Sequence, residues 1–217
     1  MVYIIMCGGN YSYFEHPKAL TEVHGEALVD RTIWLLQKAG VSADDIKITA
    51  SDPRLEGHGV EVLRHENDFK VIRDERRKIV HIEGYWLDAF IRVNVPVCYL
   101  FGDVYYTEKG IKTIAEHDTG VNTLFGTIDP DLKPWEEPLA YKVYDTKAFF
   151  EGVQAVKDLH DRGQCNRHPI VWELYRYLNG INVNQHVLDP RTYKNVPGGG
   201  MDVDGPEDLA LVERYYV

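Results

Sequence analysis

The chain has 217 residues, 44% of them hydrophobic, and a formal net charge of −10. This length and apolar content suit one α/β domain with a buried core, so we expect a single domain over residues 1–217. Nucleic-acid-binding domains are more often basic, which excludes DNA and RNA as expected partners.

The cysteines and the apolar runs indicate the expected cellular compartment. The three cysteines are far apart in the sequence, and no two have zinc-binding spacing. Reduced thiols in the cytoplasm are therefore the expected state. No apolar run approaches membrane-spanning length, and no positively charged leader precedes the first one, so we expect neither membrane association nor a signal peptide.

Short apolar runs alternate with amphipathic segments along the chain. In chain order, we expect strand Tyr3–Met6, helix Leu28–Ala39, strands Ile46–Ala50 and Val60–Leu63, helix Gly84–Val93, strand Val97–Phe101, a helix from the N-cap Thr107 to Glu116, strands Thr123–Ile128 and Leu139–Tyr144, helices Thr146–His160 and Pro169–Leu178, strand Val183–Leu188 and a C-terminal helix from Pro206. This alternation predicts a single-domain, three-layer α/β sandwich that is Rossmann-like, with a mostly parallel central sheet.

Three segments are expected to lie outside regular structure. The charge run Arg73–Lys78 is typical of a solvated surface segment. The segment Asp129–Pro138 carries three prolines and several acids, which favours a loop over one edge of the sheet. The glycines at 198–200 predict a flexible break before the C-terminal helix.

The first strand leads directly into a glycine turn, Cys7-Gly8-Gly9, and a polar loop then ends at Pro17-Lys18. A buried strand that feeds such a turn brings backbone N–H groups to the carboxyl edge of a sheet, where open α/β sheets bind ligands. Glycines let a phosphate approach the backbone closely. A lysine adds a mobile point charge that suits a phosphate.

Two acidic segments accompany this loop. Asp103 follows a buried strand and Gly102, so it is expected at the same sheet edge. Asp202 and Asp204 precede the last helix, and their alternate spacing lets both side chains point to one side of an extended segment. Asp103 alone could equally be a turn residue, and the later acids could form part of a helix cap.

The order of these features resembles the nucleotidyltransferase family with the glycosyltransferase-A-like fold. Its opening pattern is a strand, Gly-Gly, a loop, Pro-Lys-Ala-Leu at residues 17–20, a Val-x-Gly turn at 23–25 and a helix that begins Leu-Val. The segment 202–209 resembles the family's C-terminal signature Asp-Ile-Asp-Thr-Pro-Glu-Asp-Leu, with Gly205 in place of threonine. The loop departs from the family's Gly-Gly-x-Gly-x-Arg, because it has no third glycine and no arginine. Asn10, Ser12 and His16 are candidates for the arginine's role, unless triphosphate binding is weaker here.

The resemblance implies a magnesium-dependent enzyme that joins a nucleoside triphosphate to a phosphorylated small acceptor, with release of pyrophosphate. The acceptor would be a sugar, polyol or amino-alcohol phosphate. The short chain resembles cytidylyltransferases of capsule and other surface polysaccharide pathways, so CTP is the expected nucleotide. The catalytic residues would be Lys18, Asp103 and Asp204; the nucleotide would contact Cys7, Gly8, Gly9, Asn10, Lys18, Gly84 and Asp103; and Mg²⁺ would be held by Asp103 and Asp204, with Asp202 as a further ligand or outer partner.

Other interpretations remain open. A molybdopterin guanylyltransferase and a nucleotide-sugar glycosyltransferase share this fold, although a glycosyltransferase would show Asp-x-Asp where this chain has Gly-Asp-Val-Tyr at 102–105. A non-catalytic nucleotide-binding relative is the alternative from another class. The half of the chain that usually shapes the acceptor pocket contains Tyr141, Lys142, Trp172, Glu173 and Tyr175. Aromatic residues there would suit a cationic acceptor, although core packing is their commoner role. The oligomeric state, a homodimer included, stays open.

Overall fold

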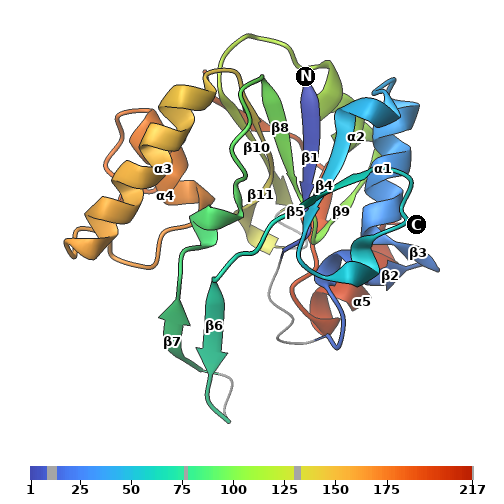
Figure 1. Ribbon diagram of the computed structural model, residues 1–217, viewed down its shortest axis with the longest axis horizontal. Coiled ribbons are helices and arrows are strands. Elements are labelled where there is room, and N and C mark those ends of the chain that lie inside the picture. The colour runs from blue at the N-terminus through green and yellow to red at the C-terminus, as the bar shows by residue number, and fades with distance from the viewer. Residues whose placement is uncertain (9–13, 76–77, 130–132, 217) are drawn as a thin grey trace.

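The computed structural model describes residues 1–8, 14–75, 78–129 and 133–216 (Figure 1). Its centre is a seven-stranded sheet in the order β12-β10-β11-β8-β1-β4-β5, as assigned within these residues. The strands are β1 (Val2–Met6), β4 (Ile46–Ala50), β5 (Glu61–Arg64), β8 (Val97–Phe101), β10 (Thr123–Asp129), β11 (Lys133–Val143) and β12 (Tyr193–Asn195). Strand β11 runs antiparallel to both of its neighbours, and the other neighbouring pairs are parallel. The sheet is therefore mostly parallel, as expected.

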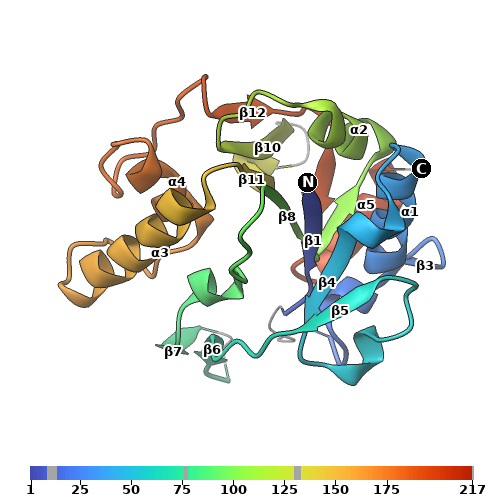
Figure 2. The ribbon, with the colours of Figure 1, turned by 45° about the horizontal axis from the view of Figure 1, so that its top comes forward.

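Helices cover both faces of this sheet. They are α1 (Leu28–Lys38), α2 (Glu108–Glu116), α3 (Thr146–Asp161), α4 (Val171–Leu178) and α5 (Pro206–Tyr215). Figure 2 shows α3 and α4 on one side and α1 and α2 on the other, which gives the expected three layers. Thr107 is the N-cap of α2, because its side chain accepts a hydrogen bond from the backbone N–H of Gly110. No helix in the described part of the chain has the length and apolar character needed to cross a membrane.

Three two-stranded ribbons accompany the sheet. They are β2–β3 (Glu22–Val23 and Glu26–Ala27), β6–β7 (Lys70–Arg73 and Ile79–Glu83) and β9–β13 (Val104–Tyr106 and Gly200–Asp202). Figure 1 shows β6 and β7 projecting from the body. Most of the charge run 73–78 falls between these two strands in the chain, and residues 76 and 77 lie outside the described part. The sequence did not predict these strands. Strands β2, β3, β9 and β13 have only two or three residues, too few to show an alternation of apolar residues, and β6 and β7 adjoin the charge run that was interpreted as a surface segment.

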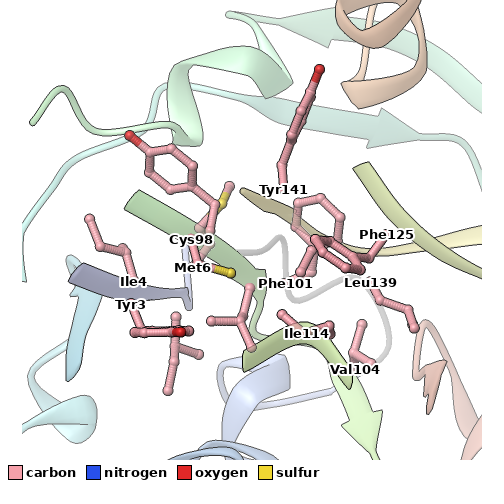
Figure 3. Packing of buried hydrophobic residues seen from close by; sticks show 14 of the residues in the cluster. Tyr3, Ile4, Met6, Cys98, Phe101, Val104, Ile114, Phe125, Leu139 and Tyr141 are labelled. Carbon is pink, nitrogen blue, oxygen red and sulfur yellow. The ribbon is translucent and has the colours of Figure 1, made fainter. Parts of the chain in front are cut away.

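The core lies between the central strands and the helices. Every residue of β8 is buried, as a continuous apolar run in a parallel sheet predicts. Figure 3 shows side chains of β1 and β8 packing toward Ile114 of α2 and toward Phe125, Leu139 and Tyr141 of β10 and β11. Burial raises the pKa of the Cys98 thiol to about 12, so this cysteine is a protonated core residue.

The expected helix Gly84–Val93 is wrong. The structure has only a 3₁₀ turn at Trp86–Ala89, flanked by extended residues at Tyr85 and Phe90. Gly84 has a φ of +63°, which a right-handed helix does not accommodate. The apolar spacing arose because Trp86 and Phe90 pack their rings on Phe101 and Tyr99 of β8.

Two further expectations are corrected. Most of the expected loop Asp129–Pro138 is the first half of β11, and Pro138 lies opposite Gly126, next to an irregularity in the pairing with β10. The expected strand Val183–Leu188 is irregular. The Asn182 side chain accepts a hydrogen bond from the backbone N–H of Asn184 and forms a turn, and the Asn184 side chain accepts one from the backbone N–H of Asn166. The last strand of the sheet is β12 instead.

The glycines at 198–200 form an ordered junction where a flexible break was expected. The backbone carbonyl of Gly199 accepts a hydrogen bond from the N–H of Thr107 at 3.1 Å, and Gly200 begins β13. The C-terminal segment is thereby fixed against β9 before α5 begins.

Candidate functional site

Strands β1 and β8 end side by side at the carboxyl edge of the sheet. Gly102 donates its backbone N–H to the carbonyl of Met6 at 3.0 Å. A Cβ at Gly102 would lie 2.5 Å from that oxygen, so only glycine allows this approach. The close contact brings Asp103 to the end of β1, where the glycine turn begins.

The C-terminal acidic segment reaches the same edge. Strand β13 pairs with β9 so that Asp202 lies opposite Val104, and Val203 donates its backbone N–H to the carbonyl of Asp103 at 2.8 Å. Asp204 comes next, and its backbone N–H donates to the Asp208 carboxylate in the first turn of α5 at 3.0 Å. Local hydrogen bonds therefore place Asp204 beside Asp103.

Lys18 joins the two carboxylates. It lies in a 3₁₀ turn (Lys18–Leu20) after Pro17, and its Nζ donates to Oδ2 of Asp103 at 2.9 Å and to Oδ1 of Asp204. Its side chain is 13% exposed. Burial lowers the pKa of Lys18, but the charges of Asp103 and Asp204 and their hydrogen bonds raise it by more, so the net pKa lies above the usual range. Lys18 therefore stays protonated and carries a positive charge.

These three residues open onto a cavity of about 490 Å³. Its polar side carries Lys18 and the carboxylates, and its other walls come from the segment before and within β6, from the 3₁₀ turn at 86–89, and from the start of α4. The lining residues are Met6, Gly8, Lys18, Asn67, Phe69, Val71, Trp86, Ala89, Phe101, Asp103, Val104, Pro138, Ile170, Val171, Trp172, Asp202 and Asp204. A charged end beside an apolar, aromatic chamber suits a ligand with a phosphate group and a flat ring.

Known proteins of the same architecture were found by structure. By sequence, the chain matches no protein-family model and no curated protein. A CTP:phosphocholine cytidylyltransferase from Streptococcus pneumoniae superposes with a TM-score of 0.57 at 15% identity, over 100% of this chain and 99% of that one. A protein assigned as a glucose-1-phosphate thymidylyltransferase from Bacillus anthracis, solved with sucrose, gives 0.57 at 16% identity, over 99% and 94% of the two chains. Molybdopterin-guanine dinucleotide biosynthesis protein A from Archaeoglobus fulgidus gives 0.53 at 14% identity, over 99% and 97%.

The chain has the nucleotidyltransferase fold. The resemblance seen in the sequence is therefore confirmed at the level of the fold. Within this fold, the described candidates Gly8, Lys18, Asp103, Asp202 and Asp204 line one cavity. Cys7 is buried next to Gly8.

Three of the remaining candidates, Gly9, Asn10 and Ser12, fall outside the described residues. His16 lies within hydrogen-bonding distance of the Thr21 hydroxyl at 3.3 Å. Gly84 packs behind the cavity wall, where a Cβ would lie 2.8 Å from the backbone of Asp68. It thus permits the path of residues 67–69, two of which line the cavity.

The acceptor-side candidates separate into two groups. Trp172 lines the cavity, whereas Tyr141 and Lys142 are buried in the core. Lys142 donates to the backbone carbonyls of Ala115 and His117 at the end of α2, and burial lowers its pKa. Lys142 therefore stabilises the fold around α2.

Glu137 is a residue of the site region that the sequence did not indicate. It is 5% exposed, and its carboxylate accepts hydrogen bonds from the backbone N–H of Asp202 and from Nε1 of Trp135, each at 3.2 Å. The signal was hidden because the segment was interpreted as a loop. As part of β11, opposite Thr127, Glu137 ties the central sheet to the acidic segment.

The donor set allows a test of the expected Mg²⁺ site. Asp103 and Asp204 bind the same ammonium nitrogen, so their oxygens converge on one point. Mg²⁺ usually takes one or two carboxylates together with phosphate and water, and this pair fits that need. Among the described residues there is no group of three or more His, Cys, Asp or Glu side chains suited to a metal, and Asp202 lines the same cavity as the pair.

Proposed function

We propose that this protein is a nucleotidyltransferase that joins a nucleoside triphosphate to a phosphorylated small acceptor and releases pyrophosphate. The observation that carries the proposal is the convergence of Lys18, Asp103 and Asp204 at the mouth of an apolar cavity. The fold, and three structural neighbours whose names refer to cytidylyl, thymidylyl and guanine dinucleotide chemistry, support it.

The proposed reaction is an in-line displacement. An oxygen of the acceptor phosphate forms a bond to the α-phosphorus, and the bond from that phosphorus to the pyrophosphate oxygen breaks. A phosphate oxygen is already a nucleophile, so the protein needs no general base. Its contribution is to position the two phosphates and stabilise the developing charge.

In this scheme Lys18 has two partners in turn. Without ligand, its ammonium neutralises Asp103 and Asp204. When triphosphate enters, Asp103 and Asp204 would hold Mg²⁺, which would supply positive charge to offset that of the phosphates. The flexible lysine side chain then turns to the phosphates, since its stem is long and its charge is compact.

CTP is the nucleotide we propose, and surface polysaccharide synthesis is the proposed setting; both rest on the family resemblance. The test is a thermal-shift and calorimetric panel of CTP, UTP, ATP and GTP with and without Mg²⁺. A ligand at 100 times its dissociation constant adds about 2.7 kcal/mol to stability, which such a panel resolves.

We expect CTP to stabilise the protein most, and only with Mg²⁺ present. A preference for GTP would overturn the cytidylyl assignment in favour of the guanylyl alternative. Tight CTP binding without pyrophosphate release, across a panel of phosphorylated acceptors, would favour the non-catalytic alternative.

A further inference from the structure

The sequence Asp-Pro-Arg occurs twice in the chain, at residues 52–54 and 189–191, and both copies form the same turn. The Asp52 carboxylate accepts hydrogen bonds from the backbone N–H of Arg54 at 2.9 Å and from its Nε and Nη2 at 3.0 and 2.7 Å. The Asp189 carboxylate accepts the same three bonds from Arg191 at 2.9, 3.0 and 2.6 Å. In each turn the proline fixes its own φ, and the guanidinium fork binds the carboxylate.

The two arginines differ in what else they contact. The Arg191 side chain is 84% exposed, and within the described part of the chain it donates only to Asp189. The Arg54 side chain is 50% exposed, and its Nη1 also donates to the backbone carbonyl of Glu15 at 3.1 Å. The turn at 189–191 therefore shows what an Asp-Pro-Arg turn does by itself, and the turn at 52–54 has the contact with Glu15 in addition.

Glu15 lies near the end of the loop that follows β1. The loop begins at Cys7, whose backbone N–H donates to the carbonyl of Thr49 in β4 at 3.0 Å. Because β1 and β4 are parallel neighbours, the turn after β4 lies at the same edge of the sheet as this loop. Strand β4 and the turn that follows it therefore bind the loop near both of its ends, at Cys7 and at Glu15.

The bond to Glu15 affects Lys18, which follows shortly after it in the chain. Lys18 begins a 3₁₀ turn, and its carbonyl accepts a hydrogen bond from the backbone N–H of Thr21 at 2.9 Å. The N–H of Leu20 donates to the carbonyl of Pro17 at 2.8 Å. Because Pro17 allows little change in φ, a fixed carbonyl at Glu15 limits the directions from which the chain can enter this turn. The position of the Lys18 backbone therefore depends on the bond to Glu15.

We infer that Arg54 is a positioning residue for the triphosphate site, because it holds the loop at Glu15 and so fixes the approach to Lys18. This inference rests on the proposed function. Arg54 is not among the described residues that line the cavity, and Asp52 offsets its charge, so it acts on the loop and not on the ligand. Residues 8–17 contain no arginine, so the guanidinium that holds them comes from the turn after β4. A loop that is held before triphosphate arrives loses less conformational freedom on binding, which raises the affinity.

The first experiment measures the anchoring in the free protein, without nucleotide. Hydrogen exchange of the Leu20 and Thr21 amides is followed by NMR in the wild type, in Arg54→Ala and in the matched control Arg191→Ala. We expect exchange to become ~10-fold faster in the Arg54 variant, since the segment opens more often, and to stay unchanged in the control. Both variants lose the same bonds to an aspartate, so their urea midpoints should be similar. Equal exchange rates in the two variants would refute the anchoring.

The second experiment measures the consequence for the nucleotide. Calorimetric titrations with CTP and Mg²⁺, and with inorganic triphosphate and Mg²⁺, should give dissociation constants ~10-fold higher for Arg54→Ala and unchanged for Arg191→Ala. The KM for CTP should rise by the same factor while kcat changes much less, as expected for a loss of binding. Arg54→Lys should restore only part of the affinity, since an ammonium lacks the fork that binds Asp52 and Glu15 together.

The outcomes separate this inference from the proposed function. Unchanged affinity for CTP and triphosphate in Arg54→Ala would refute the positioning role and leave the proposed function standing. Weaker binding in this variant, with no pyrophosphate release by the wild type on any phosphorylated acceptor, would uphold the positioning role and refute the transferase.

Discussion

The backbone N–H of Val203 donates to the backbone carbonyl of Asp103 at 2.8 Å, and this bond joins the end of the central sheet to the C-terminal acidic segment. The side chains of Asp103 and of Asp204, the residue after Val203, both bind Nζ of Lys18. Backbone pairing thus places the two carboxylates before any ligand arrives. Such preorganisation is what positional and electrostatic catalysis requires.

Replacing Lys18 should remove most of the activity. We expect Lys18→Ala to lower turnover roughly 100- to 1,000-fold, the usual effect of losing one preorganised charge contact. The control is Lys38→Ala, which removes an exposed ion pair with Glu108 and should leave turnover unchanged. Steady-state kinetics of pyrophosphate release check both, with circular dichroism to verify folding. Near wild-type turnover in the Lys18 variant would refute its phosphate role.

The two carboxylates should act as one unit. Asp103→Ala and Asp204→Ala should each raise the Mg²⁺ concentration needed for half-maximal activity, and a chelator should silence the wild type. In a double-mutant cycle the losses should be strongly non-additive, because removing either ligand disables the same site. If the two losses simply add, the residues act separately and the shared-metal proposal fails.

Gly102 should be intolerant of any side chain. We expect Gly102→Ala to destabilise the protein by about 1–3 kcal/mol, the usual cost of overpacking, since its Cβ would lie 2.5 Å from the Met6 carbonyl. Gly8→Ala is the matched control, because a Cβ there would have no described atom within 4 Å. Urea unfolding of both variants measures the difference. Equal stability would mean that the junction of β1 and β8 is looser than these contacts indicate.

The sequence predicted those parts of the fold whose signals are local. The buried runs of β1, β4 and β8 and the Thr107 cap were found where expected, since burial on both faces and capping chemistry are written in consecutive residues. The prediction of a helix at 84–93 was wrong because a chain that packs aromatic rings without regular hydrogen bonding can show the same apolar spacing as a helix. Trp86 and Phe90 are spaced in this way and pack on β8.

In the candidate site too, the residues with local sequence signals were predicted and the others were not. Lys18, Asp103 and Asp204 were indicated by motifs, each at the end of a recognisable element. Glu137 and Phe69 were not, because their positions depend on the pairing of β11 with β10 and on the path of the β6–β7 ribbon. Such non-local pairing leaves no signature within a short stretch of sequence.

Phe69, in the wall of the cavity, packs against the titratable ring of His168. The ring of His168 contacts Phe69, Tyr85 and His160, with centroid separations of 5.5, 5.3 and 5.0 Å. Its Nε2 is buried, with no hydrogen-bond partner among the described residues. Burial, and then the charge of the neighbouring His160, lowers the pKa of His168, while Glu173 opposes the shift. The remaining charges around Tyr85 are Asp161, Asp88 and Lys157.

We therefore expect acidification to destabilise the protein in part through His168. Because the folded state prefers the neutral ring, this stability is fully present above the ordinary imidazole pKa of 6.5 and is lost as the pH falls from there through the lower folded-state pKa. His168→Phe keeps the ring contacts and cannot titrate, so its urea midpoint should fall less than that of the wild type between pH 8 and pH 5, values chosen to span the ordinary imidazole pKa. His117, whose pKa burial also lowers, is present in both proteins, so the comparison isolates His168. Parallel pH profiles for the two proteins would show that His168 carries none of the effect.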